Sequence, residues 1–280
     1  MRETLAMSGF SAEWLALREP ADHTARSVDL TRWALNALPQ DAPRRILDLA
    51  AGTGSNLRYL QRALAGTTQG SAPTPSEAPS WLLVDHDAAL LACVARDPHV
   101  ETRCLDLSTL DNRGIFTGRA LVTASALLDL VSEAWVRTLA VRCAEASAAV
   151  LFALSYDGRV VCTPQDPEDE AILWLVNRHQ QTDKGFGPAL GPRATEVTAR
   201  CFEALGYRVQ RARSDWRLAR ESRDLQGQLI DGWAQAATEM APAREAMIHA
   251  WRDRRLAHVA DGQSEIVVGH EDLAGFRSPG

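Results

Sequence analysis

Short apolar runs alternate with longer stretches of helical periodicity along most of the chain. Seven of these runs predict buried strands. The first opens a strand-turn-helix unit at 45–65, and the others are at 81–84, 100–105, 120–123, 150–154, 207–212 and 264–268. Helices are predicted at 88–96, 166–181 and 194–205, with two more between 225 and 260. Apolar strands that alternate with helices are typical of a parallel sheet covered on both faces. The pattern therefore predicts an α/β fold built on a doubly wound, mostly parallel sheet.

The segments on either side of the first strand-turn-helix unit have other patterns. Apolar residues from Ala12 to Leu38 recur at three- and four-residue steps, which predicts two N-terminal helices broken at Pro20. Residues 66–80 are rich in Gly, Pro, Ser and Thr and cannot bury enough surface to fold alone, so we interpret them as an inserted flexible loop. We expect a single domain over 1–280, with a helical cap at 1–40, a binding core at 44–155 and a substrate side at 156–280.

Composition and charge narrow the class of protein further. The chain has 280 residues, of which 46% are hydrophobic and 24% charged, and this suits one large α/β domain. Its formal net charge of -6 provides no field that attracts a polyanion, so no nucleic-acid partner is expected. The five cysteines are scattered and form no C-x-x-C pair, which predicts neither disulfides nor a zinc site.

The chain also lacks a signal-peptide pattern and an apolar run of the ~20 residues that span a bilayer. We therefore expect a soluble, cytoplasmic protein with no membrane partner. Its oligomeric state does not follow from the sequence.

The first strand runs into a turn of small residues, Asp48-Leu-Ala-Ala-Gly-Thr-Gly54, and then into a helix. Glycines beside a helix N-terminus let a ligand approach backbone amides at the carboxyl end of a parallel strand. A dinucleotide site needs a further glycine where this chain has Leu57, and Asp48 would repel a pyrophosphate. The turn therefore favours a cationic, phosphate-free ligand and disfavours a dehydrogenase.

This turn resembles the first motif of class I S-adenosylmethionine-dependent methyltransferases. The resemblance implies a Rossmann-like seven-stranded sheet, S-adenosyl-L-methionine as cofactor, and a role for Asp48 in holding the methionine ammonium group. The motifs that carry the resemblance lie within about residues 45–154. Near the C-terminus, SEIVVGHEDLAGF resembles the antiparallel last strand of the family. Ala50 departs from the family, which usually has glycine there. The cofactor contacts expected around the turn are Asp48, Ala50, Gly52, Thr53, Gly54 and Asn56.

Two further acids end the strands that follow the turn. Asp85 ends the second strand, where a carboxylate can accept hydrogen bonds from two vicinal ribose hydroxyls. Asp106 ends the third, where the resemblance places an acid beside the adenine amino group and the backbone amide of Leu107 against the ring. An acid in such a place is also a common helix cap or turn former, and this alternative stays open. His86 and Ser125 complete the expected cofactor contacts.

The end of the fourth strand bears on the methyl acceptor. Members of this superfamily that methylate flat amino groups carry an acid or Asn, two prolines and an aromatic residue there, and this chain does not. An oxygen or carboxylate acceptor is therefore favoured. Asp129 in this segment is a candidate for substrate contact, and a helix-capping role is the alternative.

Residues 177–196 form the segment richest in polar groups. They follow the fifth strand and its helix, a connection that commonly covers the active site in this superfamily. His179 is a candidate general base, Asp183 shares its helical face, and Lys184 is a candidate partner for a substrate anion. Phe186 completes the candidate substrate contacts of this segment. The alternative is that His179 lies on a helix surface and Lys184 is solvated.

Arg18, Asp22 and Arg26 lie at four-residue steps near the N-terminus. Such spacing usually gives a solvated ladder of ion pairs. If this helix roofs the substrate pocket, Arg18 and Arg26 become partners for an anionic substrate. Trp216 is interpreted as a packing residue, and Trp251 with Arg254 and Arg255 as surface features.

These patterns together predict an S-adenosylmethionine-dependent methyltransferase that acts on a small, possibly anionic molecule and needs no metal. Methylation of an oxygen or a carboxylate is favoured. The alternative is a catalytically inactive protein that binds the cofactor as a sensor or partner subunit, and Ala50 and the lack of a clear catalytic base support it.

Overall fold

The computed structural model describes residues 10–39, 44–67 and 78–277. Its centre is an eight-stranded sheet of order β3-β2-β1-β4-β5-β8-β6, and β7 pairs with β8 beside this path. The strands from β3 to β5 are parallel, whereas β8 runs antiparallel to β5, β6 and β7. The predicted Rossmann-like α/β class with an antiparallel last strand is confirmed. Most of the predicted insertion, residues 68–77, lies outside the described part of the chain.

The elements have the following bounds. The strands are β1 (Arg45–Leu49), β2 (Ser80–Asp85), β3 (Val100–Cys104), β4 (Leu121–Ser125), β5 (Ala149–Thr163), β6 (Arg208–Arg213), β7 (Trp216–Leu218) and β8 (Glu265–Phe276). The helices are α1 (Ala12–Ala25), α2 (Val28–Asn36), α3 (Ser55–Thr67), α4 (Ala88–Leu91), α5 (Glu133–Glu145), α6 (Asp169–His179), α7 (Ala194–Glu203), α8 (Arg223–Met240) and α9 (Glu245–Ala260). None of the helices in the described part is long and apolar enough to cross a membrane.

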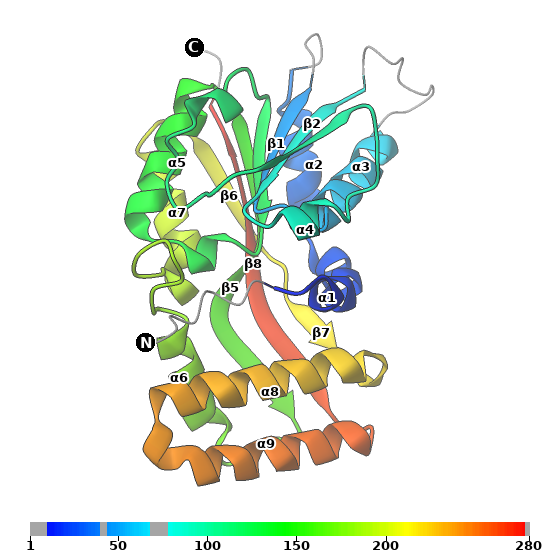
Figure 1. Cartoon of the computed structure of the whole chain (residues 1–280), viewed down its shortest axis with the longest axis vertical. Coiled ribbons are helices and arrows are strands. Elements are labelled where there is room, and N and C mark those ends of the chain that lie inside the picture. The colour runs from blue at the N-terminus through cyan, green and yellow to red at the C-terminus, as the bar shows by residue number, and fades with distance from the viewer. Residues whose placement is uncertain (1–9, 40–43, 68–77, 278–280) are drawn as a thin grey trace.

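Helices cover both faces of the parallel half of the sheet (Figure 1). Leu139 of α5 and Phe202 of α7 belong to the core on one face, and Leu35 of α2 and Leu60 of α3 to the core on the other. Nearly every residue of β1, β2 and β4 is consequently buried. Burial on both faces is the physical reason for the continuous apolar runs in these strands.

The long strands β5 and β8 continue past the parallel strands and carry a second core (Figure 1). The predicted strands at 150–154 and 264–268 are therefore too short, since β5 has 15 residues and β8 has 12. In the continuation, Val160 and Cys162 pack into the core formed with α6, α8 and α9, whereas Val161 is exposed. Burial on one face gives a strand in which apolar and polar residues alternate. The parallel strands are continuous apolar runs, so this part of β5 and β8 does not match their pattern and is not predicted as strand.

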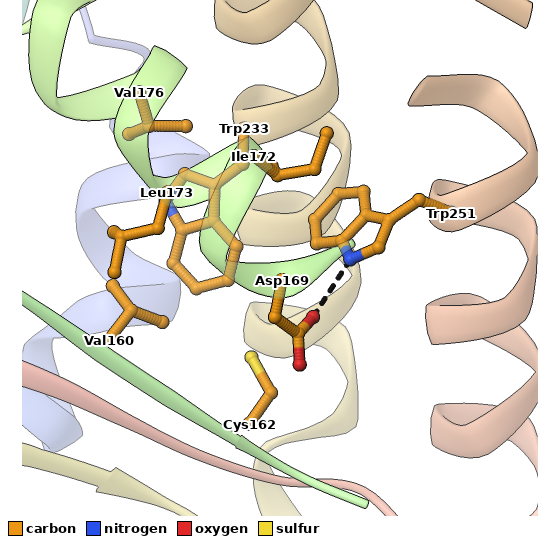
Figure 2. Close-up of a pocket in the computed structure, with 8 residues that line it drawn as sticks. All are labelled: Val160, Cys162, Asp169, Ile172, Leu173, Val176, Trp233 and Trp251. Atoms are coloured by element: carbon orange, nitrogen blue, oxygen red, sulfur yellow. Dashed lines mark hydrogen bonds between the residues drawn. The ribbon is translucent and has the colours of Figure 1, made fainter. Parts of the chain in front are cut away.

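The second core contains a buried polar contact between α6 and α9. Trp251 Nε1 donates a hydrogen bond of 2.8 Å to Asp169, and the two side chains point toward each other (Figure 2). Asp169 also pairs with Arg255, whose side chain is fully buried. Asp169 and Trp251 line a cavity of about 30 Å³, which has room for about one water. The predicted surface position of Trp251 and Arg255 is wrong, because α9 closes the core with this face.

The N-terminal helices differ from the prediction in where they break. α1 continues through Pro20, which is exposed, and ends at Ala25. The next helix begins after Ser27, whose hydroxyl accepts the N–H of Leu30 as an N-cap. The predicted break at Pro20 is wrong because buried contacts of α1 on either side of the proline hold the helix together. The predicted packing role of Trp216 is confirmed, since this residue of β7 is 3% exposed.

Asp272 of β8 ties the N-terminal segment to the sheet. Its Oδ1 accepts the backbone N–H of Leu154 at 2.9 Å, at an irregularity in the pairing of β5 with β8. Its Oδ2 accepts the N–H of Ser27, between α1 and α2, also at 2.9 Å. Arg26 lies 3.7 Å from the same oxygen, and both side chains are almost fully buried.

We expect the substitution Asp272→Ala to lower the free energy of unfolding by about 3–5 kcal/mol, because it leaves Arg26 buried without its counter-charge and two N–H groups without an acceptor. Urea denaturation followed by tryptophan fluorescence measures this. Glu265→Ala, at an exposed position of the same strand, is the control and should change stability by less than about 0.5 kcal/mol. Equal effects of the two substitutions would contradict the role assigned to Asp272.

Candidate functional site

A cavity of about 560 Å³ lies at the carboxyl ends of β1, β2 and β4, and α1 and the loop after α6 complete its walls. Many residues predicted from the sequence line it: Arg18, Ala50, Gly52, Thr53, Asn56, Asp85, His86, Ser125, His179, Asp183, Lys184 and Phe186. Candidates from the cofactor motif and from the 177–196 segment therefore face one space. The structure places the other predicted residues outside this lining, namely Arg26, Asp48, Gly54, Asp106, Leu107 and Asp129.

The turn after β1 has the conformation that its glycines predict. Gly52 and Gly54 have φ values of 52° and 81°, and Ala50 has φ 52°, in the left-handed region that favours glycine. A Cβ atom on Gly52 would lie 3.0 Å from Leu15 Cδ1 of α1. The N-terminal helix thus lies directly against the turn, and a side chain at position 52 would require both a left-handed backbone and a small shift of Leu15.

Asp85 is fixed at the end of β2 by the turn itself. Its Oδ2 accepts the N–H of Gly52 at 2.8 Å, and its Oδ1 accepts the N–H of Asp87 at 3.0 Å. His86 Nδ1 lies 3.1 Å from Oδ1. Each carboxylate oxygen has two acceptor sites. Oδ2 therefore keeps a second acceptor site for a donor in the cavity, whereas the second site of Oδ1 is next to His86.

Asp48 lies beneath the turn and is completely buried. Burial raises its pKa to about 7. One oxygen accepts a 2.7 Å hydrogen bond from Asn56 Nδ2, and the other has no partner among the described residues. A buried carboxylate oxygen without a donor is costly, and a cationic ligand above the turn would relieve that cost. Asn56, which lines the cavity, connects Asp48 to it.

Arg26 lies under the cavity and does not face it. Its Nη1 donates to Asn56 Oδ1 at 2.9 Å, its guanidinium stacks 4.2 Å from the Tyr59 ring, and Asp272 provides its counter-charge. The interpretation of Arg26 as a substrate contact is corrected accordingly. Its contacts make it a structural support for the Asn56 amide.

Arg18 and Asp22 form a buried ion pair in the cavity wall. Two hydrogen bonds of 2.9 and 3.1 Å join their side chains. Trp216 Nε1 donates to Asp22 at 3.1 Å, and the Arg18 guanidinium lies over the Trp216 ring. The predicted solvated ladder is wrong, because α1 turns this face toward β7 and the cavity. The charge of Arg18 is largely neutralised by Asp22.

Asp129 lies behind the cavity wall that Leu127 and Leu130 form. Burial raises the pKa of its carboxyl to about 6. Its Oδ1 has no hydrogen-bond partner among the described residues. Asp129 is therefore not among the residues that line the cavity.

At the end of β3, Asp106 and Leu107 both have contacts within the protein. Asp106 is exposed, and its carboxylate accepts from the backbone N–H and the hydroxyl of Ser108 at 2.7 and 2.8 Å. Leu107 is buried in the core, where its carbonyl accepts from Trp135 Nε1 at 2.6 Å. Asp106 has the contacts of a turn former, the alternative that the sequence left open.

The loop after α6 has a defined internal structure. Asp183 Oδ1 accepts the N–H groups of Gly185 and Gly187 at 2.7 and 3.0 Å. The Phe186 ring packs edge-on against Trp135, with ring centroids 5.9 Å apart. These contacts hold the loop against the cavity. Asp183 therefore has a structural task within the loop.

Both ring nitrogens of His179 have partners. Nε2 lies 3.0 Å from Glu239 Oε2 of α8, and Nδ1 lies 3.4 Å from Lys184 Nζ. A general base needs a free lone pair within reach of the substrate proton. This geometry does not leave one, so His179 is not placed as the predicted base. Sequence reasoning did not identify Glu239, because its contact joins residues 60 positions apart.

In the described ranges, no group of three or more His, Cys, Asp or Glu side chains is arranged so that it could hold a metal ion.

Comparisons with known proteins add the following. No protein-family model matches the chain, and no curated protein matches it. Among solved structures, the cyclopropane synthase MmaA2 from Mycobacterium tuberculosis is 11% identical (TM-score 0.47; 95% of this chain, 94% of that chain). A putative type II methyltransferase from Anaeromyxobacter dehalogenans is 14% identical (TM-score 0.49; 90% and 96%). A geranyl diphosphate methyltransferase is 12% identical (TM-score 0.43; 97% and 92%). Likeness of this degree concerns the arrangement of elements, and the chemistry of the site is argued from its own residues.

The conformation of Ala50 predicts that Ala50→Gly stabilises the protein by about 0.5–1 kcal/mol. A left-handed conformation costs alanine roughly 1–2 kcal/mol, and the greater freedom of glycine in the unfolded chain offsets part of the gain. Ala51→Gly is the matched control, since Ala51 is not in that conformation, and it should destabilise by about 0.5–1 kcal/mol. Urea denaturation of both variants gives the comparison, and a loss of stability in Ala50→Gly would contradict the prediction.

Proposed function

We propose that the chain is an S-adenosylmethionine-dependent methyltransferase that acts on a small, anionic molecule. The observation that carries this proposal is the floor of the cavity. There the glycine turn and the Asp85 carboxylate line the cavity at the end of one parallel strand pair, and Asn56 connects the cavity to the Asp48 carboxylate, which is buried beneath the turn with one unpartnered oxygen.

These residues fit the cofactor in charge and in hydrogen bonding. Asp85 would accept the ribose hydroxyls, and the backbone around Gly52 and Thr53 would lie against the cofactor. Asn56, which lines the cavity, would face its ammonium group, with the buried Asp48 carboxylate behind it. An acid at the end of the second strand suits the ribose of a nicotinamide dinucleotide equally well, so the argument against that ligand rests on Asp48 and on Leu57 in place of a third glycine.

When bound, S-adenosylmethionine supplies a methyl group already activated by a positive sulfur. The chain then has to position the acceptor and exclude water. Leu15 against Gly52 and Phe186 against Trp135 close the cavity from two sides with apolar groups. A carboxylate acceptor is ionised at neutral pH and needs no base, which agrees with the engagement of both His179 nitrogens.

One charge of the cavity wall, that of Lys184, supports an anionic substrate. The Arg18 guanidinium is paired with Asp22, whereas Lys184 Nζ contacts a ring nitrogen, His179 Nδ1, and no carboxylate among the described residues lies within ion-pair distance of it. Lys184 lines the cavity and retains further N–H groups. It is therefore the cation of the lining that is best able to bind a carboxylate or a phosphate.

Isothermal titration calorimetry with S-adenosylhomocysteine tests the cofactor. We expect binding to the unaltered protein, and a loss of about 1–3 kcal/mol in Asp85→Asn, because a site built for two hydroxyl donors loses an acceptor. Asp111→Asn is the control and should bind nearly as well as the unaltered protein, because Asp111 is exposed and lies outside the cavity lining. Binding of NADH with no response to S-adenosylhomocysteine would overturn the proposal.

Transfer of labelled methyl groups from S-adenosylmethionine to a panel of small carboxylic acids, phosphates and phenols tests the substrate class. Acids should be methylated, and Lys184→Gln should reduce kcat/KM about 10- to 100-fold while S-adenosylhomocysteine affinity stays unchanged, because a charge-assisted bond worth ~1.5–3 kcal/mol is lost. Methylation of neutral acceptors alone would contradict the anionic preference. Cofactor binding without any transfer across the panel would favour the sensor alternative.

A further inference from the structure

Lys184 is the only lysine in the 280 residues, and the other 29 basic residues of the Lys and Arg total are arginines. The two residue types differ chemically. A guanidinium stays charged and forms a planar fork, whereas an ammonium is compact and changes its pKa readily when it is desolvated. The single position with an amine is half-buried and lines the cavity. This choice of residue could have been noticed in the sequence.

The amine belongs to a chain of hydrogen bonds that crosses from the loop to α8. Glu239 Oε2 is 3.0 Å from His179 Nε2, and His179 Nδ1 is 3.4 Å from Lys184 Nζ. An ionised carboxylate can only accept, so Nε2 carries the proton and Nδ1 is the acceptor for Lys184. His179 is thereby oriented by Glu239 and presents a lone pair to the amine. Gln235 Nε2 bonds the second oxygen of Glu239 at 3.1 Å.

The surroundings of Lys184 act on its charge in opposite directions. Partial burial lowers the pKa of the amine, and the negative charge of Glu239 raises it. The other charged groups of the cavity lining are engaged elsewhere. Asp183 accepts two backbone N–H groups of its loop, Arg18 and Asp22 pair with each other, and Asp85 accepts from the turn.

We propose that Glu239 is a positioning residue that holds the Lys184 amine toward the cavity through His179 and favours its charged form. The orienting carboxylate comes from α8, outside the cavity lining. The amine keeps its remaining N–H groups for an anion. The identity of the bound anion rests on the proposed function, whereas the relay itself does not.

Competitive acetylation with trace acetic anhydride tests the relay without cofactor or substrate. The labelling of Lys184 is measured by peptide mass spectrometry across a pH series, with the N-terminal α-amino group as internal reference. Only the neutral amine reacts, so Glu239→Gln should shift the Lys184 profile to lower pH. We expect labelling at neutral pH to rise about 1.5- to 5-fold, the range for a partly exposed charge pair. At 1 M salt, where screening acts over ~3 Å, the difference should shrink.

Asp231→Asn is the matched control, since Asp231 is another acid of α8 and pairs with Arg252 at 2.6 Å. It should leave the Lys184 profile unchanged. An equal shift in both variants, or none in Glu239→Gln, would overturn the proposal.

The role of His179 is tested by combining substitutions. If Glu239 acts through the imidazole, Glu239→Gln should have a smaller effect in a His179→Gln background than in the unaltered protein. An unchanged effect there would show that Glu239 acts through space and would remove His179 from the relay. Circular dichroism checks that each variant is folded. Failure of S-adenosylhomocysteine to bind would bear on the proposed function alone, because the labelling uses neither cofactor nor substrate.

Discussion

The buried carboxylate of Asp272 is the constraint on which the arrangement of this protein depends. It accepts a backbone N–H from β5 and another from the link between α1 and α2, and it faces Arg26. Arg26 in turn holds the amide of Asn56, which contacts Asp48 beneath the glycine turn. A continuous buried polar chain thus joins the last strand, the N-terminal helices and the floor of the cavity. Breaking one link of such a network leaves buried polar groups unpaired, which is costly, so these elements can take few other positions relative to one another. Three atoms of the chain, Arg26 Nε, Arg26 Nη2 and Asp48 Oδ2, have no hydrogen-bond partner among the described residues.

The extension of β5 and β8 has a direct consequence for the site. It carries α6 and α8, which pack against each other in a core separate from that of the parallel strands. Glu239 belongs to this second part of the fold. The loop with Lys184 joins the two parts, because it follows α6 of the second core while its Phe186 packs against Trp135 of the first.

Two of the four non-glycine residues with positive φ in the described ranges, Ala50 and Ala126, line the cavity. Leu154 lies within the irregularity of β5 that Asp272 stabilises, and Ser147 lies between α5 and β5, outside the lining. Each such conformation costs of order 1–3 kcal/mol. The surrounding structure maintains these conformations at the ends of β1 and β4, where a close approach of the backbone to a ligand is useful.

The sequence by itself determined the sheet class, the positions of the parallel strands and the glycine turn, because burial on both faces and positive φ values leave local patterns. It also placed Asp85, His179 and Lys184 in segments that the structure brings to one cavity. Only the tertiary structure decided the lengths of β5 and β8, since burial on one face depends on distant helices. It also decided that Arg26 supports Asn56, that Arg18 pairs with Asp22 in a buried wall, and that Glu239 reaches His179. The partners of a long polar side chain depend on elements packed against it from elsewhere in the chain, and spacing within one segment holds no information about them.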